Sequence, residues 1–177
     1  MKRPPAHCVR VPRGDLSGFG RPGATDMNPA IARRQLLLAA AVTALPAWAV
    51  AATPIEVWKG PACGCCQDWI AYLEANGFKA RVHDQGNTDA RARLGMPLRF
   101  GSCHTALVGG YVVEGHVPAR EIRRLLAEKP KAVGIAVPAM PIGSPGMDGP
   151  AYGGRRDPYD VLLVRKDGSA SVYQSYP

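Results

Sequence analysis

Short stretches in which hydrophobic and polar residues alternate predict four strands in the first part of the ordered chain. They are residues 55–58, 78–83, 105–108 and 111–114, and a period of two is typical of a strand with one buried face. Two glycines separate the last two stretches and predict a tight β-hairpin between them.

Apolar residues at helical spacing predict three helices among these strands. Residues 66–76 repeat large apolar side chains every three to four positions, and a following glycine supplies a stop signal. A short helix is predicted to begin at an Asn87 cap and to run through residue 94. Residues 118–129 predict an amphipathic helix that lies between two prolines.

The order strand, helix, strand, helix, hairpin, helix is that of a thioredoxin-like domain, with a βαβ half followed by a ββα half. We therefore predict one thioredoxin-like α/β domain over residues 52–177, with a central mixed sheet flanked by helices. Residues 137–154 are rich in Pro and Gly and predict a long loop. Residues 159–164 and 170–174 predict a C-terminal hairpin that extends the sheet.

Composition and charge narrow the class of protein. The chain has 177 residues, and its apolar content of 46% is typical of a globular domain. The formal net charge is +8, but residues 1–51 hold seven Lys/Arg against two acids, whereas residues 52–177 hold fifteen against twelve. No basic cluster interleaved with aromatic residues follows, so a nucleic-acid partner is not expected.

Residues 27–51 predict a signal peptide. Arg33 and Arg34 supply its charged start, a Leu/Ala/Val run follows, and small residues near Ala49 offer cleavage sites. The run is shorter than the roughly 20 residues of a transmembrane helix, so no stable membrane span is expected after cleavage. An uncleaved anchor is the alternative. The arginine pair indicates export to a bacterial periplasm, by the general or the twin-arginine route.

Residues 1–26 precede this signal, are rich in Pro, Gly and Arg, and carry no hydrophobic period. We interpret them as a disordered extension of the gene model ahead of a natural start at Met27. Cys8 then has no role, and the mature chain holds four cysteines.

Three of these cysteines, Cys63, Cys65 and Cys66, lie where the first predicted strand meets the first helix. Unpaired N–H groups and the helix dipole stabilise thiolates at a helix N-terminus. A thiolate is both a redox nucleophile and a ligand for soft metals. The predicted topology returns Cys103 and His104 to the same place, which would make a four-cysteine site.

Several motifs in this order resemble the CopG-like family of exported bacterial copper-resistance proteins. They are Cys-x-Cys-Cys-x-x-Trp after a strand, Ser-Cys-His-Thr-Ala before a hairpin, Glu-Gly-His-Val-Pro, and Met-Pro-x-Gly-Ser-Pro-Gly-Met followed by Tyr-Asp-Val-Leu-Leu. The resemblance covers residues 54–173. It implies a thioredoxin-like fold, a periplasmic location, and copper held by clustered cysteines with help from His and Met.

Ligand chemistry supports copper independently, because soft thiolates and thioethers select Cu(I) and imidazole accepts both copper states. Adjacent Cys65 and Cys66 point in different directions, which favours more than one copper ion. A mixed ligand set could let copper change oxidation state, although no catalytic residue is assigned. Copper ions, and other periplasmic copper-handling or redox proteins, are the expected partners. The candidate metal ligands are Cys63, Cys65, Cys66, Cys103, His104 and Met147.

Other interpretations remain open. Cys63 and Cys66 have the spacing of a thiol–disulfide oxidoreductase, which is the main alternative. A structural disulfide or a structural zinc site is a further one, although zinc would leave the methionines of the loop unexplained. For His116, just before a predicted helix, we expect a capping or structural role rather than metal ligation.

Overall fold

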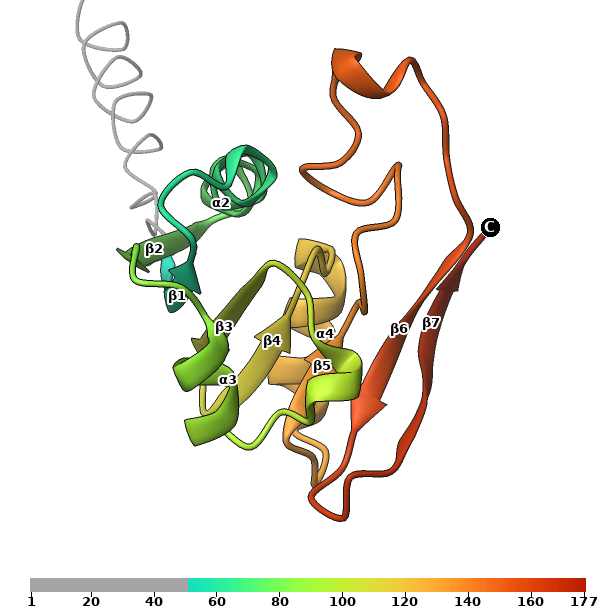
Figure 1. Cartoon of the computed structure of the whole chain (residues 1–177). Helices are drawn as coiled ribbons and strands as arrows, with labels where there is room; N and C mark the ends of the chain where they lie inside the picture. The colour runs from blue at the N-terminus through green and yellow to red at the C-terminus, as the bar shows by residue number, and fades with distance from the viewer. Residues whose placement is uncertain (1–50) are drawn as a thin grey trace, which may run out of the picture. The chain divides into compact units, whose positions relative to one another are not determined.

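Seven strands form one mixed sheet in the computed structural model, which describes residues 51–177 (Figure 1). The predicted extension at residues 1–26, with Cys8, and the predicted signal peptide up to residue 50 lie outside the described residues. Within residues 51–177, no helix has the length and apolar character that a membrane crossing requires.

The sheet has the strand order β2-β1-β3-β4-β5-β6-β7. β1 runs parallel to β2 and antiparallel to β3, while β4 runs antiparallel to β3 and parallel to β5. β6 and β7 form the C-terminal hairpin and pair antiparallel with β5 and with each other. The strands are β1 (Thr53–Lys59), β2 (Phe78–His83), β3 (His104–Val108), β4 (Tyr111–Glu114), β5 (Gly134–Ala136), β6 (Tyr159–Val164) and β7 (Ala170–Tyr176).

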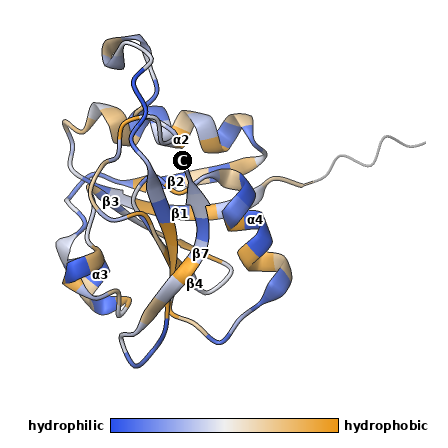
Figure 2. Ribbon diagram, turned by 90° about the vertical axis from the view of Figure 1, so that its right-hand side faces the viewer, coloured by the Kyte–Doolittle hydropathy of each residue, from blue (hydrophilic) through white to orange (hydrophobic). Residues whose placement is uncertain are grey.

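Helices cover both faces of this sheet, and Figure 2 shows α3 and α4 on opposite sides of the central strands. The helical segments are α2 (Gly64–Ala75), α3 (Thr88–Arg93), α4 (Ala119–Glu128) and the short 3-10 helices η1 (Leu98–Phe100) and η2 (Pro150–Tyr152). Side chains of α2 and α4 share the larger core with inward residues of the strands. Met96 and Phe100, around η1, pack with alternate strand residues in a smaller cluster. The period-two alternation explains the two clusters, because neighbouring residues of one strand face opposite ways.

The predicted single α/β domain with its mixed sheet, flanking helices and C-terminal hairpin is confirmed. The strand β5 was not predicted, because three residues are too few to show a period. Asn87 does occupy the N-cap position of α3, but its side chain makes no cap hydrogen bond. Its amide instead donates to the Ser102 carbonyl at 3.1 Å and to the Thr105 hydroxyl at 3.2 Å. A tertiary contact therefore replaces the expected local one.

The predicted loop of residues 137–154 is largely irregular, with η2 as its regular element, and it packs onto the domain. Ser144 and Met147 are buried in it. The loop therefore covers part of the domain although it has no core of its own.

Gly134 allows β5 to pair closely with β4, because a Cβ atom at this position would collide with the backbone carbonyl of Val112. We expect Gly134→Ala to lower the free energy of unfolding by about 3 kcal/mol, since the clash is with backbone and cannot be relieved by a rotamer change. Urea unfolding followed by circular dichroism measures this loss. Gly149→Ala is the matched control: a Cβ meets nothing within 4 Å there and φ is −69°. Equal stabilities of the two variants would contradict the expectation.

Candidate metal centre

The N-terminus of α2 positions three cysteines beside the end of β1. Cys63 is the N-cap residue, with φ −79° and ψ 98°, and Cys65 and Cys66 lie in the first helical turn. Residues three apart on a helical turn share one face, so the side chains of Cys63 and Cys66 meet. They form a disulfide, with Cα atoms 5.4 Å apart.

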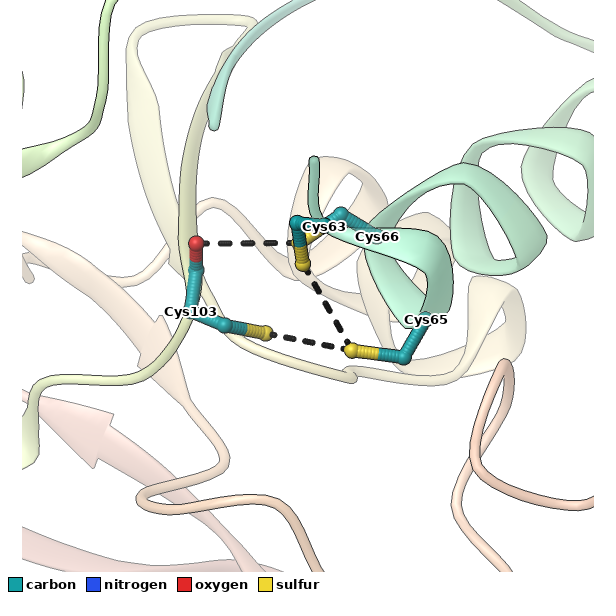
Figure 3. Close-up of side chains that lie close together, drawn as sticks. All are labelled: Cys63, Cys65, Cys66 and Cys103. Atoms are coloured by element: carbon teal, nitrogen blue, oxygen red, sulfur yellow. Dashed lines mark hydrogen bonds between the residues drawn. A yellow bond between two sulfur atoms is a disulfide. The ribbon is translucent and has the colours of Figure 1, made fainter. Parts of the chain in front are cut away.

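Cys65 and Cys103 are the free thiols among the described residues, and their sulfurs point toward each other (Figure 3). The Cys65 sulfur lies 3.6 Å from that of Cys63 and 3.9 Å from that of Cys103. The buried Cys66 sulfur instead faces the carbonyl oxygen of Cys103, at 3.7 Å. Adjacent Cys65 and Cys66 therefore diverge, as expected from their neighbouring positions.

Strand pairing brings Cys103 to this place. β1 and β3 are antiparallel, and the end of β1 at Lys59 pairs with His104 at the start of β3. The residue before His104 therefore lies next to the start of α2. All four sulfurs lie within 4.8 Å of one another, so the structure brings together the cysteines of the predicted site.

Two histidine rings contact the same sulfur. The Cys103 sulfur lies 3.4 Å from Nδ1 of His104 and 3.1 Å from Nε2 of His116. Both rings are fully buried, and the ring of Trp69 packs on His104 with centroids 4.2 Å apart. These three side chains form a second group whose possible ligand atoms lie within 4.8 Å of one another: Cys103, His104 and His116.

The sequence favoured a capping or structural role for His116 over metal ligation and did not place its ring beside Cys103, where the structure has it. The register of the β3–β4 hairpin is the sequence signal that would have placed His116 near Cys103. The Gly-Gly turn pairs Val108 with Tyr111 and Thr105 with Glu114, and continuing that pairing sets residue 103 opposite residue 116. His116 therefore belongs with the candidate site.

Burial sets the protonation of these groups. It lowers the pKa of His104, with a smaller contribution from nearby His116, and it also lowers the pKa of His116. Both rings are therefore neutral at pH 7 and carry a free lone pair. The pKa of Cys103 is raised to about 12, mainly by burial and to a smaller extent by the neighbouring Cys65. This group is therefore a thiol in the metal-free protein.

A buried ion pair fixes the backbone around Cys103. The carboxylate of Glu114 accepts hydrogen bonds from the Ser102 amide at 2.7 Å, Arg91 Nε at 2.8 Å and the Thr105 hydroxyl at 2.6 Å. Arg91 also donates to the Ser102 carbonyl at 2.7 Å. Burial raises the pKa of Glu114, and its donors oppose that shift. The segment that carries Cys103 is thereby tied to β4 on both sides.

The loop of residues 137–154 packs against α2 and against His116. The Pro145 carbonyl lies 2.8 Å from Nδ1 of His116. Gly146 has φ +82°, and a Cβ on it would lie 2.7 Å from the Cys65 oxygen and the Trp69 nitrogen. The sulfur of Met147 accepts a hydrogen bond from the Tyr152 hydroxyl at 3.3 Å. The loop thus reaches the site, and Met147 stays a predicted ligand.

Two solved structures titled copper resistance protein CopG, forms 2 and 1, are similar to this chain. Each is 48% identical and aligns with a TM-score of 0.65, and the matches cover 71% of this chain and 99% and 98% of theirs. A family model described as a protein of unknown function, DUF411, matches residues 100–147. A search of curated proteins found no match. The chain belongs to the CopG-like family, which confirms the resemblance noted in the sequence.

The raised pKa of Cys103 predicts slow alkylation of the native, metal-free protein. Only the thiolate reacts, so at pH 8 iodoacetamide should modify native Cys103 at least about tenfold more slowly than unfolded Cys103. The unfolded thiol, with an ordinary pKa near 9.0, should approach its full rate by about pH 10, whereas the native rate should keep rising toward pH 12. Timed labelling and mass spectrometry of the Cys103 peptide measure both rates, and Cys65 in the same digest reports reagent access. Equal native and unfolded rates would refute this assignment.

Proposed function

We propose that this protein is a periplasmic copper-binding protein whose cysteine cluster binds Cu(I) in copper resistance or homeostasis. A copper-related function is supported by its relatives, titled copper resistance proteins, and by the group of cysteines that could bind a metal. The observation that carries the proposal is the convergence of four sulfurs within 4.8 Å of one another, from two segments far apart in sequence.

The spacing of the sulfurs suits a metal ion. Bonds of about 2.3 Å from a tetrahedral metal to sulfur place the sulfurs roughly 3.8 Å apart. The Cys63–Cys65 and Cys65–Cys103 separations of 3.6 and 3.9 Å are close to this value. A sulfur-only donor set favours Cu(I) over harder ions. The divergence of Cys65 and Cys66 supports binding of more than one copper ion.

The Cys63–Cys66 disulfide must be reduced before all four sulfurs can act as thiolates. Copper loading is thus linked to the redox state of the protein, and the imidazole of His104 could assist a change in copper oxidation state. Other periplasmic copper-handling or redox proteins are the proposed partners. The signal predicted at residues 27–51 supports a periplasmic location, and a disulfide is typical of such an oxidising compartment.

A thiol–disulfide oxidoreductase is the second candidate. The Cys63–Cys66 disulfide lies at a helix N-terminus, a position that stabilises thiolates and so suits thiol–disulfide exchange. The two additional sulfurs within reach of this pair favour metal binding instead. If the protein is a thiol–disulfide oxidoreductase, the Cys103→Ala and Met147→Leu variants should still reduce the disulfides of insulin.

Anaerobic titration of the reduced protein with Cu(I), against a competing chelator, tests copper binding. We expect the wild type to retain Cu(I), and Cys63→Ser with Cys66→Ser to lose at least half of the bound copper or to bind at least about tenfold more weakly, because two thiolates are removed. The exposed Met140→Leu variant should match the wild type, since Met140 lies outside the predicted ligand set. No retention by the wild type, or equal retention by the double variant, would contradict the proposal.

A further inference from the structure

We propose that an open cleft at the end of the sheet away from the cysteines binds phosphate groups, either of a small soluble molecule or of lipid headgroups. The cleft has a volume of about 910 Å³ and lies where three connections meet: the β3–β4 turn, the α4–β5 connection and the β6–β7 turn. β3 runs from His104 at the cysteines to Val108 at the cleft, so the two places lie at opposite ends of one strand. Phosphate binding there therefore requires no copper in the metal centre.

The cleft is lined by three lysines and by no acidic residue: Lys129, Lys131 and Lys166. All three are exposed, and none takes part in an ion pair within residues 51–177. The acidic residues next to them in the sequence are engaged elsewhere. The Glu128 carboxylate accepts hydrogen bonds from Arg124 at 2.7 Å and from the Tyr173 hydroxyl at 2.8 Å. The Asp167 carboxylate accepts two from Ser169, at 2.9 and 2.7 Å.

Hydrogen bonds fix the α4–β5 connection, which carries two of these lysines. The Tyr111 hydroxyl donates to the Pro130 carbonyl at 2.9 Å, in the middle of the connection. At its end, the Val133 carbonyl accepts from the Val112 amide at 2.9 Å, and the Val133 amide donates to the Val164 carbonyl at 2.8 Å. The connection is thereby tied to β4 and to β6. A bound anion has to order lysine side chains but no backbone here, which lowers the entropic cost of binding.

Charge and lining together favour a phosphate with an organic part. An ammonium group binds phosphate as a compact point charge, and three of them favour a ligand that presents more than one negative charge. Half-buried Leu126, Tyr111 and Pro130 supply an apolar wall for the organic part. The dipole of α4 opposes an anion at its C-terminus by the equivalent of about half a charge, which three full charges outweigh. Stabilisation of that helix end does not account for Lys166, which belongs to the β6–β7 turn.

Titration of the metal-free full chain with inorganic triphosphate, followed by the NMR shifts of the backbone amides, tests this site. The amides of Gly109 and Gly110, which line the cleft, should shift, whereas that of Cys103 at the other end of β3 should not. Lys129→Gln with Lys131→Gln should weaken binding at least about fivefold, because two of the three positive charges are removed.

Lys79→Gln with Arg81→Gln is the matched control, because it removes two exposed positive charges from β2, which lines no part of this cleft. Affinity for triphosphate should stay within about twofold of the wild type. Circular dichroism verifies the fold of each variant. Equal weakening by both double variants, or shifts spread over every exposed basic segment, would show attraction by net charge alone and would overturn the site.

Vesicles distinguish the two sources of phosphate. Co-sedimentation with mixed phosphatidylglycerol and phosphatidylcholine vesicles, compared with phosphatidylcholine alone, measures binding to anionic headgroups. Vesicle binding that is reduced by Lys129→Gln with Lys131→Gln assigns the cleft to lipid headgroups, whereas triphosphate binding without vesicle binding assigns it to a soluble phosphate. Absence of any binding that depends on these lysines would overturn the proposal. The Cu(I) titration of the reduced protein is separate, so its outcome bears on the metal centre alone.

Discussion

The candidate metal centre depends on the hydrogen bonds that the buried carboxylate of Glu114 accepts. This carboxylate accepts hydrogen bonds from Ser102, Arg91 and Thr105, so the backbone on both sides of Cys103 is tied to β4. Burying this charge without partners would cost several kcal/mol, and the three donors offset that cost. Because the network holds the residues on both sides of Cys103, the backbone of this segment cannot move away from α2 unless these hydrogen bonds break.

Strand β3 joins the two groups of donors, since it pairs with β1 on one side and with β4 on the other. The first pairing sets Cys103 beside the cysteines of α2, and the second sets it beside His116. One sulfur therefore belongs to an all-sulfur group and to a mixed nitrogen and sulfur group. The disulfide of Cys63 and Cys66 includes none of the residues of the mixed group.

Local signals predicted most of the fold, and tertiary contacts account for what they missed. The strands around the Gly-Gly hairpin and the amphipathic helix α4 follow from period and turn chemistry, which need only neighbouring residues. β5 has three residues and no period of its own, and it exists because β4 and β6 pair with it. Asn87 is at a cap position, yet its side-chain amide donates hydrogen bonds to Ser102 and Thr105. The residues around Asn87 in the sequence do not predict these contacts.

The sequence by itself determined the donor types, their grouping around Cys63 to Cys66, and the return of Cys103 and His104 to that group. Those inferences hold because helix periodicity and strand order depend on residue type and spacing. Only the tertiary structure decided that Cys63 pairs with Cys66, and that His116 shares the Cys103 sulfur with His104. Side-chain direction and ring orientation depend on contacts across strands and with the covering loop, and one-dimensional spacing does not encode them.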